Sequence, residues 1–99
     1  MDVLSQLAAN RLVPVVVLDD AKDADGLAGA LVAGGLPVAE ITFRTAAAEE
    51  SIRVMAARGD VLVGAGTVLT VEQVDKAVAA GAHYIVSPGT NRAVVERAQ

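Results

Sequence analysis

Three polar side chains recur at every second position of an otherwise apolar segment. Within residues 37–45, PVAEITFRT, these are Glu40, Thr42 and Arg44. Alternate residues of a β-strand point to the same face, so a carboxylate, a hydroxyl and a guanidinium would share one face here. Such a face is either exposed to water or lines a binding site, and this choice decides what chemistry the chain can perform.

Glu40 is the strongest candidate for that chemistry. Its apolar neighbours Val38, Ala39 and Ile41 would keep water from the carboxyl group, which would raise its pKa toward the range useful for proton transfer near neutral pH. The alternative is a structural ion pair with Arg44, which lies about 13 Å further along a strand and would have to reach back. The residue types alone leave both interpretations open.

Other candidates lie where the expected strands end. Arg44 offers a rigid fork for a carboxylate or phosphate, or is an exposed arginine at the edge of the sheet. In residues 64–67, GAGT, the glycines let the backbone approach a ligand and Thr67 offers a hydroxyl. A dinucleotide-binding fingerprint is excluded because Leu69 occupies the place of its third glycine. Pro88 follows the fourth strand and lies either beside a pocket or in a simple turn.

The remaining polar residues predict no further site. Asp19 and Asp20 have no histidine at ligand spacing, so we expect one of them to start a helix and we expect no metal site. His83 opens the fourth strand at the opposite edge and is assigned no catalytic role. The chain has two lysines, Lys22 and Lys76, and we expect both on the surface.

Composition bounds the class of protein. With 99 residues, 54% of them hydrophobic, the chain predicts one domain, residues 1–99, with an aliphatic core. No apolar run reaches the roughly 18 to 20 residues that cross a membrane. A net charge of −4 without a cluster of basic residues argues against nucleic acid as a partner. The absence of cysteine and of a recognisable secretory signal fits the cytoplasm.

Strand and helix patterns alternate along the chain. A short amphipathic segment at residues 3–10 precedes four β-branched runs separated by helical patterns, at residues 13–18, 38–43, 61–65 and 84–87. Parallel βα units of this kind form either part of a (βα)8 barrel or an open, flavodoxin-like doubly wound sheet. A carboxylate in mid-strand favours the barrel, whose active sites lie at the carboxyl ends of the strands.

Four βα units are half of the eight that close such a barrel. The first and fourth strands would therefore keep unpaired edges, and the inner sheet face would stay uncovered. Self-association of two chains is one way to cover them.

Local signals predict the helix boundaries. Glycines at 34–35, 59 and 81 are placed to end the first three helices. Thr70 and Gln73 have the spacing of a capping box, and Thr45 and Thr90 lie where two other helices should begin. In the helix after the third strand, the predicted buried face is Val71, Val74, Ala77 and Val78.

Several of these segments together resemble a known family. They are VPVV at 13–16, LVAGG at 31–35, EITFRT at 40–45, VGAGTVL at 63–69 and SPG at 87–89. In this order and spacing they are similar to the N-terminal half of 2-keto-3-deoxy-6-phosphogluconate (KDPG) aldolase, also called 4-hydroxy-2-oxoglutarate aldolase. The resemblance implies a (βα)8 barrel, usually trimeric, that cleaves KDPG to pyruvate and an aldehyde through a Schiff base and needs no metal or cofactor.

The resemblance also implies roles for individual residues. Glu40 would be the general acid and base, Arg44 and Thr67 would hold the carboxylate of the keto acid, and Pro88 would line the pocket. The Schiff-base lysine of the family lies on a later strand, and neither lysine here corresponds to it. We therefore expect this chain alone to be inactive. The alternative is a non-catalytic half-barrel, natural or engineered, that folds or self-associates.

Overall fold

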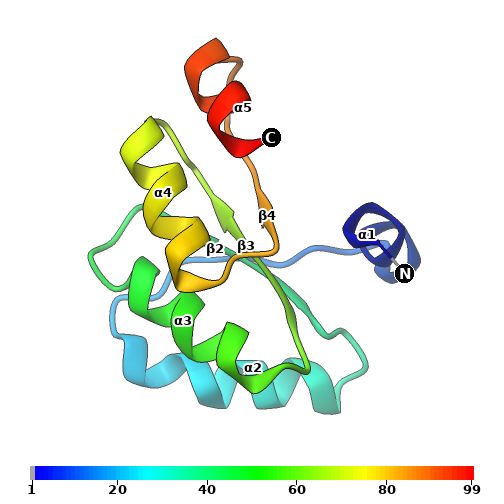
Figure 1. The fold of residues 1–99 in the computed structure, drawn as a ribbon. Coiled ribbons are helices and arrows are strands. Elements are labelled where there is room, and N and C mark those ends of the chain that lie inside the picture. The colour runs from blue at the N-terminus through cyan, green and yellow to red at the C-terminus, as the bar shows by residue number, and fades with distance from the viewer. Residues whose placement is uncertain (1) are drawn as a thin grey trace.

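The computed structural model describes residues 2–99 and contains one sheet of four parallel strands (Figure 1). The strands are β1 (Val15–Val16), β2 (Val38–Thr42), β3 (Leu62–Gly66) and β4 (Tyr84–Ile85). Their order in the sheet follows the chain, β1-β2-β3-β4. A flavodoxin-like sheet has the order 2-1-3 at its start. The sequential order therefore confirms the prediction of a (βα)4 half-barrel and excludes the open doubly wound alternative.

Within residues 2–99, six helical segments accompany the strands. They are α1 (Val3–Asn10), the 3-10 helix η1 (Ala21–Asp23), α2 (Ala24–Ala33), α3 (Ala48–Arg58), α4 (Val71–Ala80) and α5 (Arg92–Ala98). Helices α2, α3 and α4 lie together on one side of the sheet, whereas α1 stands apart from them (Figure 1). No helix within residues 2–99 combines the length and the apolar character needed to cross a membrane.

The core lies between the sheet and these three helices. Ala39 and Ile41 of β2 and Val63 and Ala65 of β3 point toward the helices and are fully buried. They alternate with Glu40 and Gly64, as the period of a strand requires. The helices contribute one buried face each, of which Ile52 and Met55 in α3, Val74 and Ala77 in α4, and Ala24 and Ala28 in α2 form the centre. The alternation predicted for β2 is therefore present.

Helix boundaries partly follow the predicted signals. Gly59 and Gly81, with φ of 79° and 101°, end α3 and α4. The Thr70 hydroxyl accepts a hydrogen bond from the Gln73 amide at 3.1 Å and caps α4. Thr90 does not cap α5; Asn91 does, because its side chain accepts from the Val94 amide.

Thr45 is also wrongly predicted as a cap. Its hydroxyl donates to the carbonyl oxygen of Leu18, which ties the segment after β2 to the segment after β1. Ala47 occupies the N-cap position of α3 and makes no capping bond with its side chain. The Thr45 hydroxyl therefore makes a tertiary hydrogen bond instead of the helix cap that the local sequence predicts.

The second face of the sheet is largely uncovered in residues 2–99. Large apolar residues of the β1 segment and of the segment after β4 are 36–61% exposed, namely Val13, Val15, Val17 and Val86. In the described part of the chain, strand β1 pairs only with β2, and β4 only with β3. Val78 of α4, predicted to be buried, is 60% exposed because it faces a groove of about 460 Å³ beside β4 that no other part of residues 2–99 fills.

Candidate active site

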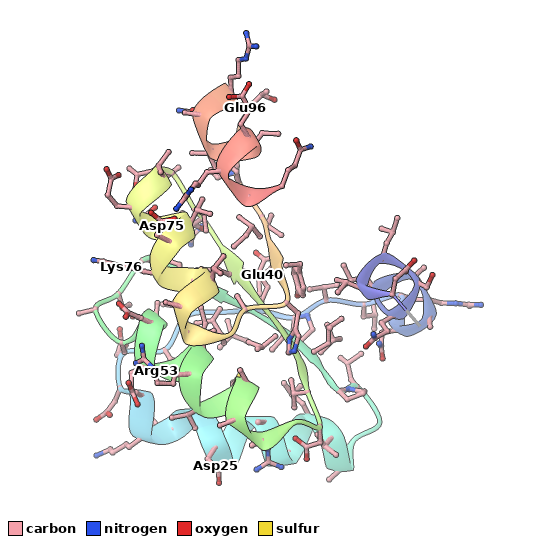
Figure 2. The ribbon with its side chains drawn as sticks, in the orientation of Figure 1. Asp25, Glu40, Arg53, Asp75, Lys76 and Glu96 are labelled. Atoms are coloured by element: carbon pink, nitrogen blue, oxygen red, sulfur yellow. The ribbon has the colours of Figure 1, made fainter. Side chains whose placement is uncertain are left out.

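Glu40 lies at the middle of β2, on the sheet face that the helices do not cover. It is in register with Val15 of β1 and Gly64 of β3, and partners in a parallel ladder share a face. Figure 2 shows Glu40 at the centre of the sheet beside β3 and β4, far from the lysine of α4, Lys76, which points away from it. Glu40 therefore projects from the middle of a strand that is paired on both sides.

A glycine on β3 provides the space for this carboxylate. A Cβ atom at Gly66 would lie 2.3 Å from Oε2 of Glu40 and 2.8 Å from its Cδ, far inside van der Waals contact. Gly66 does not have a positive φ, so its backbone conformation does not require glycine. What requires glycine here is the side chain of Glu40, which lies across the backbone of β3.

Burial controls the protonation of Glu40. Partial removal of water raises the pKa of its carboxyl group above the usual value, and no charged neighbour offsets this. Arg44 is exposed, and among residues 2–99 no ion pair joins it to Glu40. The structural ion pair between the two residues is therefore wrong, and Glu40 is a partly desolvated carboxyl group with no ion-pair partner among residues 2–99.

The other candidate residues follow the carboxyl ends of the strands. Arg44 comes two residues after β2, Thr67 directly after β3, and Pro88 three residues after Ile85 of β4. Parallel strands place all these ends at the same edge of the sheet. The Val68 amide donates to the Val86 carbonyl at 3.2 Å, which holds the segment of Thr67 beside the segment of Pro88.

Thr67 has an unusual backbone conformation. Its φ is 54°, in the left-handed region that a β-branched side chain rarely adopts. Such strained residues cluster at functional sites, where the surrounding structure maintains them. The sequence signal, a threonine after two glycines, pointed to this residue but not to its conformation.

The residues predicted to be structural have structural partners. The Asp20 side chain accepts from the Lys22 amide at 3.0 Å and caps η1. The Lys22 side chain is 79% exposed and lies 3.5 Å from the same carboxylate. His83 places its Nδ1 3.0 Å from the Val63 amide, which donates to it. None of these groups approaches Glu40 through a contact within residues 2–99.

Tyr84 is the residue that the sequence analysis missed. It is in register with Gly64, on the same face as Glu40, and its hydroxyl donates to the carbonyl oxygen of Ala39 at 3.1 Å. The available signal in the sequence was Gly64, because a large side chain from the adjacent strand can lie over a glycine.

The chain matches one family model over almost its whole length. Residues 3–99 match the model described as "Aldolase: KDPG and KHG aldolase". A curated relative from Treponema pallidum (strain Nichols), a 2-dehydro-3-deoxy-phosphogluconate aldolase, is 54% identical over 86 residues, which are 86% of this chain and 41% of the relative. The chain thus spans less than half the length of this relative.

Solved structures agree in both fold and sequence. The KDPG aldolase of Zymomonas mobilis ATCC 29191 superimposes with a TM-score of 0.86 at 42% identity, over 99% of this chain and 48% of that one. The Legionella pneumophila KDPG aldolase, solved with pyruvate captured as a covalent carbinolamine, has a TM-score of 0.81 at 42% identity, over 86% of this chain and 42% of its own. The parallel half-barrel, its central carboxylate and these matches lead to one conclusion: this chain belongs to the KDPG and KHG aldolase family.

Proposed function

We propose that these residues form the proton-transfer and carboxylate-binding part of an aldolase site for 2-keto-3-deoxy-6-phosphogluconate or 4-hydroxy-2-oxoglutarate. The observation that carries the proposal is the partly desolvated Glu40 on the uncovered sheet face, in a space made by Gly66. A carboxyl group whose pKa is raised by burial can both give and take protons near neutral pH. Arg44, Thr67 and Pro88 follow the carboxyl ends of β2, β3 and β4 and therefore lie at one edge of the sheet.

The proposed reaction needs an amine that these residues do not supply. A lysine amine adds to the keto group of the substrate to give a carbinolamine, which loses water to form an iminium. Removal of the proton from the C4 hydroxyl then breaks the C3–C4 bond, which releases C4 as an aldehyde and leaves an enamine. The enamine takes up a proton at C3, and hydrolysis of the resulting iminium releases pyruvate and the free amine. Glu40 would move the protons of these steps, while Arg44 and Thr67 would hold the carboxylate of the keto acid.

Neither lysine of this chain suits the role of the amine. Lys22 is bound to Asp20 at the surface, and Lys76 points away from Glu40 (Figure 2). We therefore expect the 99-residue chain to form no Schiff base with pyruvate. Borohydride reduction followed by mass spectrometry tests this, and a reduced adduct on either lysine would contradict it.

The catalytic part of the proposal is tested by complementation. The chain is co-expressed with the part of the Treponema pallidum relative that it does not match, and pyruvate release from KDPG is measured. We expect activity in the mixture and none in either part alone. Glu40→Gln should lower kcat about 100-fold or more, whereas Arg44→Ala should chiefly raise KM, about 10-fold or more.

Matched variants separate these roles from general damage. Glu72→Gln changes an exposed carboxylate on α4 and should leave both constants unchanged. A mixture that assembles into a stable complex but releases no pyruvate, or an active Glu40→Gln mixture, would refute the proposed function.

A second candidate function is self-association of a half-barrel. The exposed apolar face at Val13, Val15, Val17 and Val86, together with the outer edges of β1 and β4, favours it. Two copies could cover these edges by pairing strand to strand. Sedimentation velocity over a range of concentrations tests this: a dimer or larger assembly supports it, and a monomer at all concentrations refutes it.

A further inference from the structure

One row of the sheet places an aromatic ring next to the candidate catalytic carboxylate. Glu40 of β2 is in register with Gly64 of β3, and Gly64 is in register with Tyr84 of β4. The three residues therefore share the uncovered face. Gly64 has no side chain, so nothing separates the side chains of Glu40 and Tyr84 along this row.

The ring of Tyr84 occupies the space above Gly64. A Cβ atom at Gly64 would lie 2.2 Å from Cε2 of Tyr84 and 2.3 Å from its Cζ, so the ring lies directly against the β3 backbone. At its far end the hydroxyl donates to the Ala39 carbonyl on β2 at 3.1 Å. Tyr84 thus crosses β3 completely and joins β4 to the residue that precedes Glu40.

Glu40 uses the neighbouring glycine in the same way. Its carboxyl group lies over Gly66, two residues further along β3 than Gly64. The two glycines therefore accommodate two side chains from opposite directions, Tyr84 from β4 and Glu40 from β2. The ring borders the position of Glu40 on the side of β4, where the sheet would otherwise be open.

Tyr84 is the titratable group that faces Glu40 across β3. The β1 segment presents Val15 and Val17 on this face, β3 presents its glycines, and Arg44 is exposed beyond the end of β2. Burial, and secondarily the charge of Glu40, raise the pKa of Tyr84 to about 12. The phenol therefore stays neutral while Glu40 titrates.

We propose that Tyr84 is a positioning residue, whose ring shields the carboxyl group of Glu40 from water and fixes its side chain over Gly66. This inference deepens the proposed function, since it concerns the group that would carry protons there. The ring, rather than the hydroxyl, is the part that excludes water. The hydroxyl holds the ring in place through Ala39.

The test is an NMR titration of the Glu40 side-chain carboxyl in the 99-residue chain. We compare the parent with Tyr84→Phe, which keeps the ring, and Tyr84→Leu, which removes it but keeps an apolar side chain. We expect the Tyr84→Leu variant to move the titration midpoint of Glu40 to lower pH, toward that of an exposed glutamate. The Tyr84→Phe variant should keep most of the rise in that midpoint. A parent-like titration in the Leu variant, or an equal shift in both variants, would overturn the proposal.

Urea unfolding of the same variants separates shielding from general stability. The Phe variant should unfold at lower urea because it loses the bond to Ala39, yet it should titrate almost as the parent does. A Glu40 midpoint that simply follows stability across the variants would refute a positioning role.

A reciprocal measurement covers the case in which the Leu variant does not fold. The chain has one tyrosine, so ultraviolet absorbance reports the ionisation of Tyr84 alone. Glu40→Gln should let this phenol ionise at lower pH than in the parent, and an unchanged titration would overturn the proposal. These titrations need no substrate, so they succeed or fail independently of the complementation experiment.

Discussion

Thr67 holds a backbone conformation that its own side chain opposes. At φ 54° a β-branched residue is strained by about 1–2 kcal/mol, and glycine would adopt this conformation freely. We expect Thr67→Gly to increase the free energy of unfolding by up to about 1 kcal/mol, since the added chain entropy of glycine offsets part of the gain. Urea denaturation measures it, and the same change should weaken keto-acid binding in the complemented enzyme.

The control for this prediction is Thr90→Gly. Thr90 is exposed and does not have a positive φ, so glycine relieves no strain there. Its substitution should leave stability unchanged or slightly lower. If both glycine variants changed stability alike, strain at Thr67 would not be the cause.

Glu40 should make stability depend on pH in a definite direction. Burial raises the pKa of its carboxyl group in the folded chain, so the folded state binds the proton more tightly than the unfolded state does. The stability that comes from binding this proton is therefore fully present below the pKa that Glu40 has in the unfolded chain. It is lost as pH rises through the pKa that Glu40 has in the folded chain. We expect Glu40→Gln to be more stable than the parent at pH 7 and equal to it below about pH 4.

Thermal unfolding at several pH values measures this difference. Glu72→Gln is the matched control, because its carboxylate is exposed in the first turn of α4, where a negative charge is favourable. It should show no stabilisation at neutral pH. A stabilisation by Glu40→Gln that persisted unchanged into acid would exclude ionisation as its source.

A side chain added at position 66 should displace the Glu40 carboxyl group without unfolding the chain. An added methyl group collides with the end of a flexible side chain, which can move aside into water. We expect Gly66→Ala to remain folded while the Glu40 carboxyl titrates at lower pH than in the parent. Gly26→Ala, on an open helical position, should leave that titration unchanged and stabilise the chain by about 0.5–1 kcal/mol.

Only those features of the candidate site that depend on one local segment could be predicted from the sequence. Strand alternation placed Glu40 on one face, and strand ends placed Arg44 and Thr67 at one edge. The support of Glu40 by Gly66 and the crossing of Tyr84 over Gly64 depend on the register between strands, which no single segment encodes. The left-handed Thr67 contradicts the preference of its residue type, so propensity could not predict it.

At the scale of elements, two of the three threonines predicted as helix caps, Thr70 and Thr90, make a matched pair. Thr70 caps α4, whereas Thr90 leaves the capping of α5 to Asn91. We expect Thr70→Ala to lower the free energy of unfolding by about 1 kcal/mol and Thr90→Ala to change it little. Chemical denaturation of both variants measures the contrast, and equal losses would show that the capping bond is not the cause.

Strand lengths show where prediction from sequence ends. Strands β2 and β3 have partners on both sides and run for five residues each, within one residue of the predicted segments. Strands β1 and β4 have one partner each and run for only two residues, although the apolar runs at 13–18 and 84–87 predicted more. A run of β-branched residues indicates a strand, but its paired length depends on neighbours that lie elsewhere in the chain.

At the scale of the whole molecule, the uncovered sheet face should govern association. Val15 is 61% exposed in the same row as Glu40. If two copies cover this face, Val15→Asp should shift sedimentation toward the monomer, because the charge would be buried without a partner. Leu12→Asp, at a residue that is 68% exposed but lies outside the paired strands, is the control and should change association less. Equal effects of both substitutions would locate the interface elsewhere.

The sequential strand order has a consequence for how the chain acquires its structure. Every strand pairs with one that lies only 20 to 25 residues away in sequence, so each pairing closes a short loop. Closing a loop of this length costs less chain entropy than pairing strands from opposite ends of the chain would. During synthesis, β2 can join β1 before β3 has left the ribosome, and each later unit can add to a sheet that already exists. A growing chain of this kind need not wait for its last residue to begin folding.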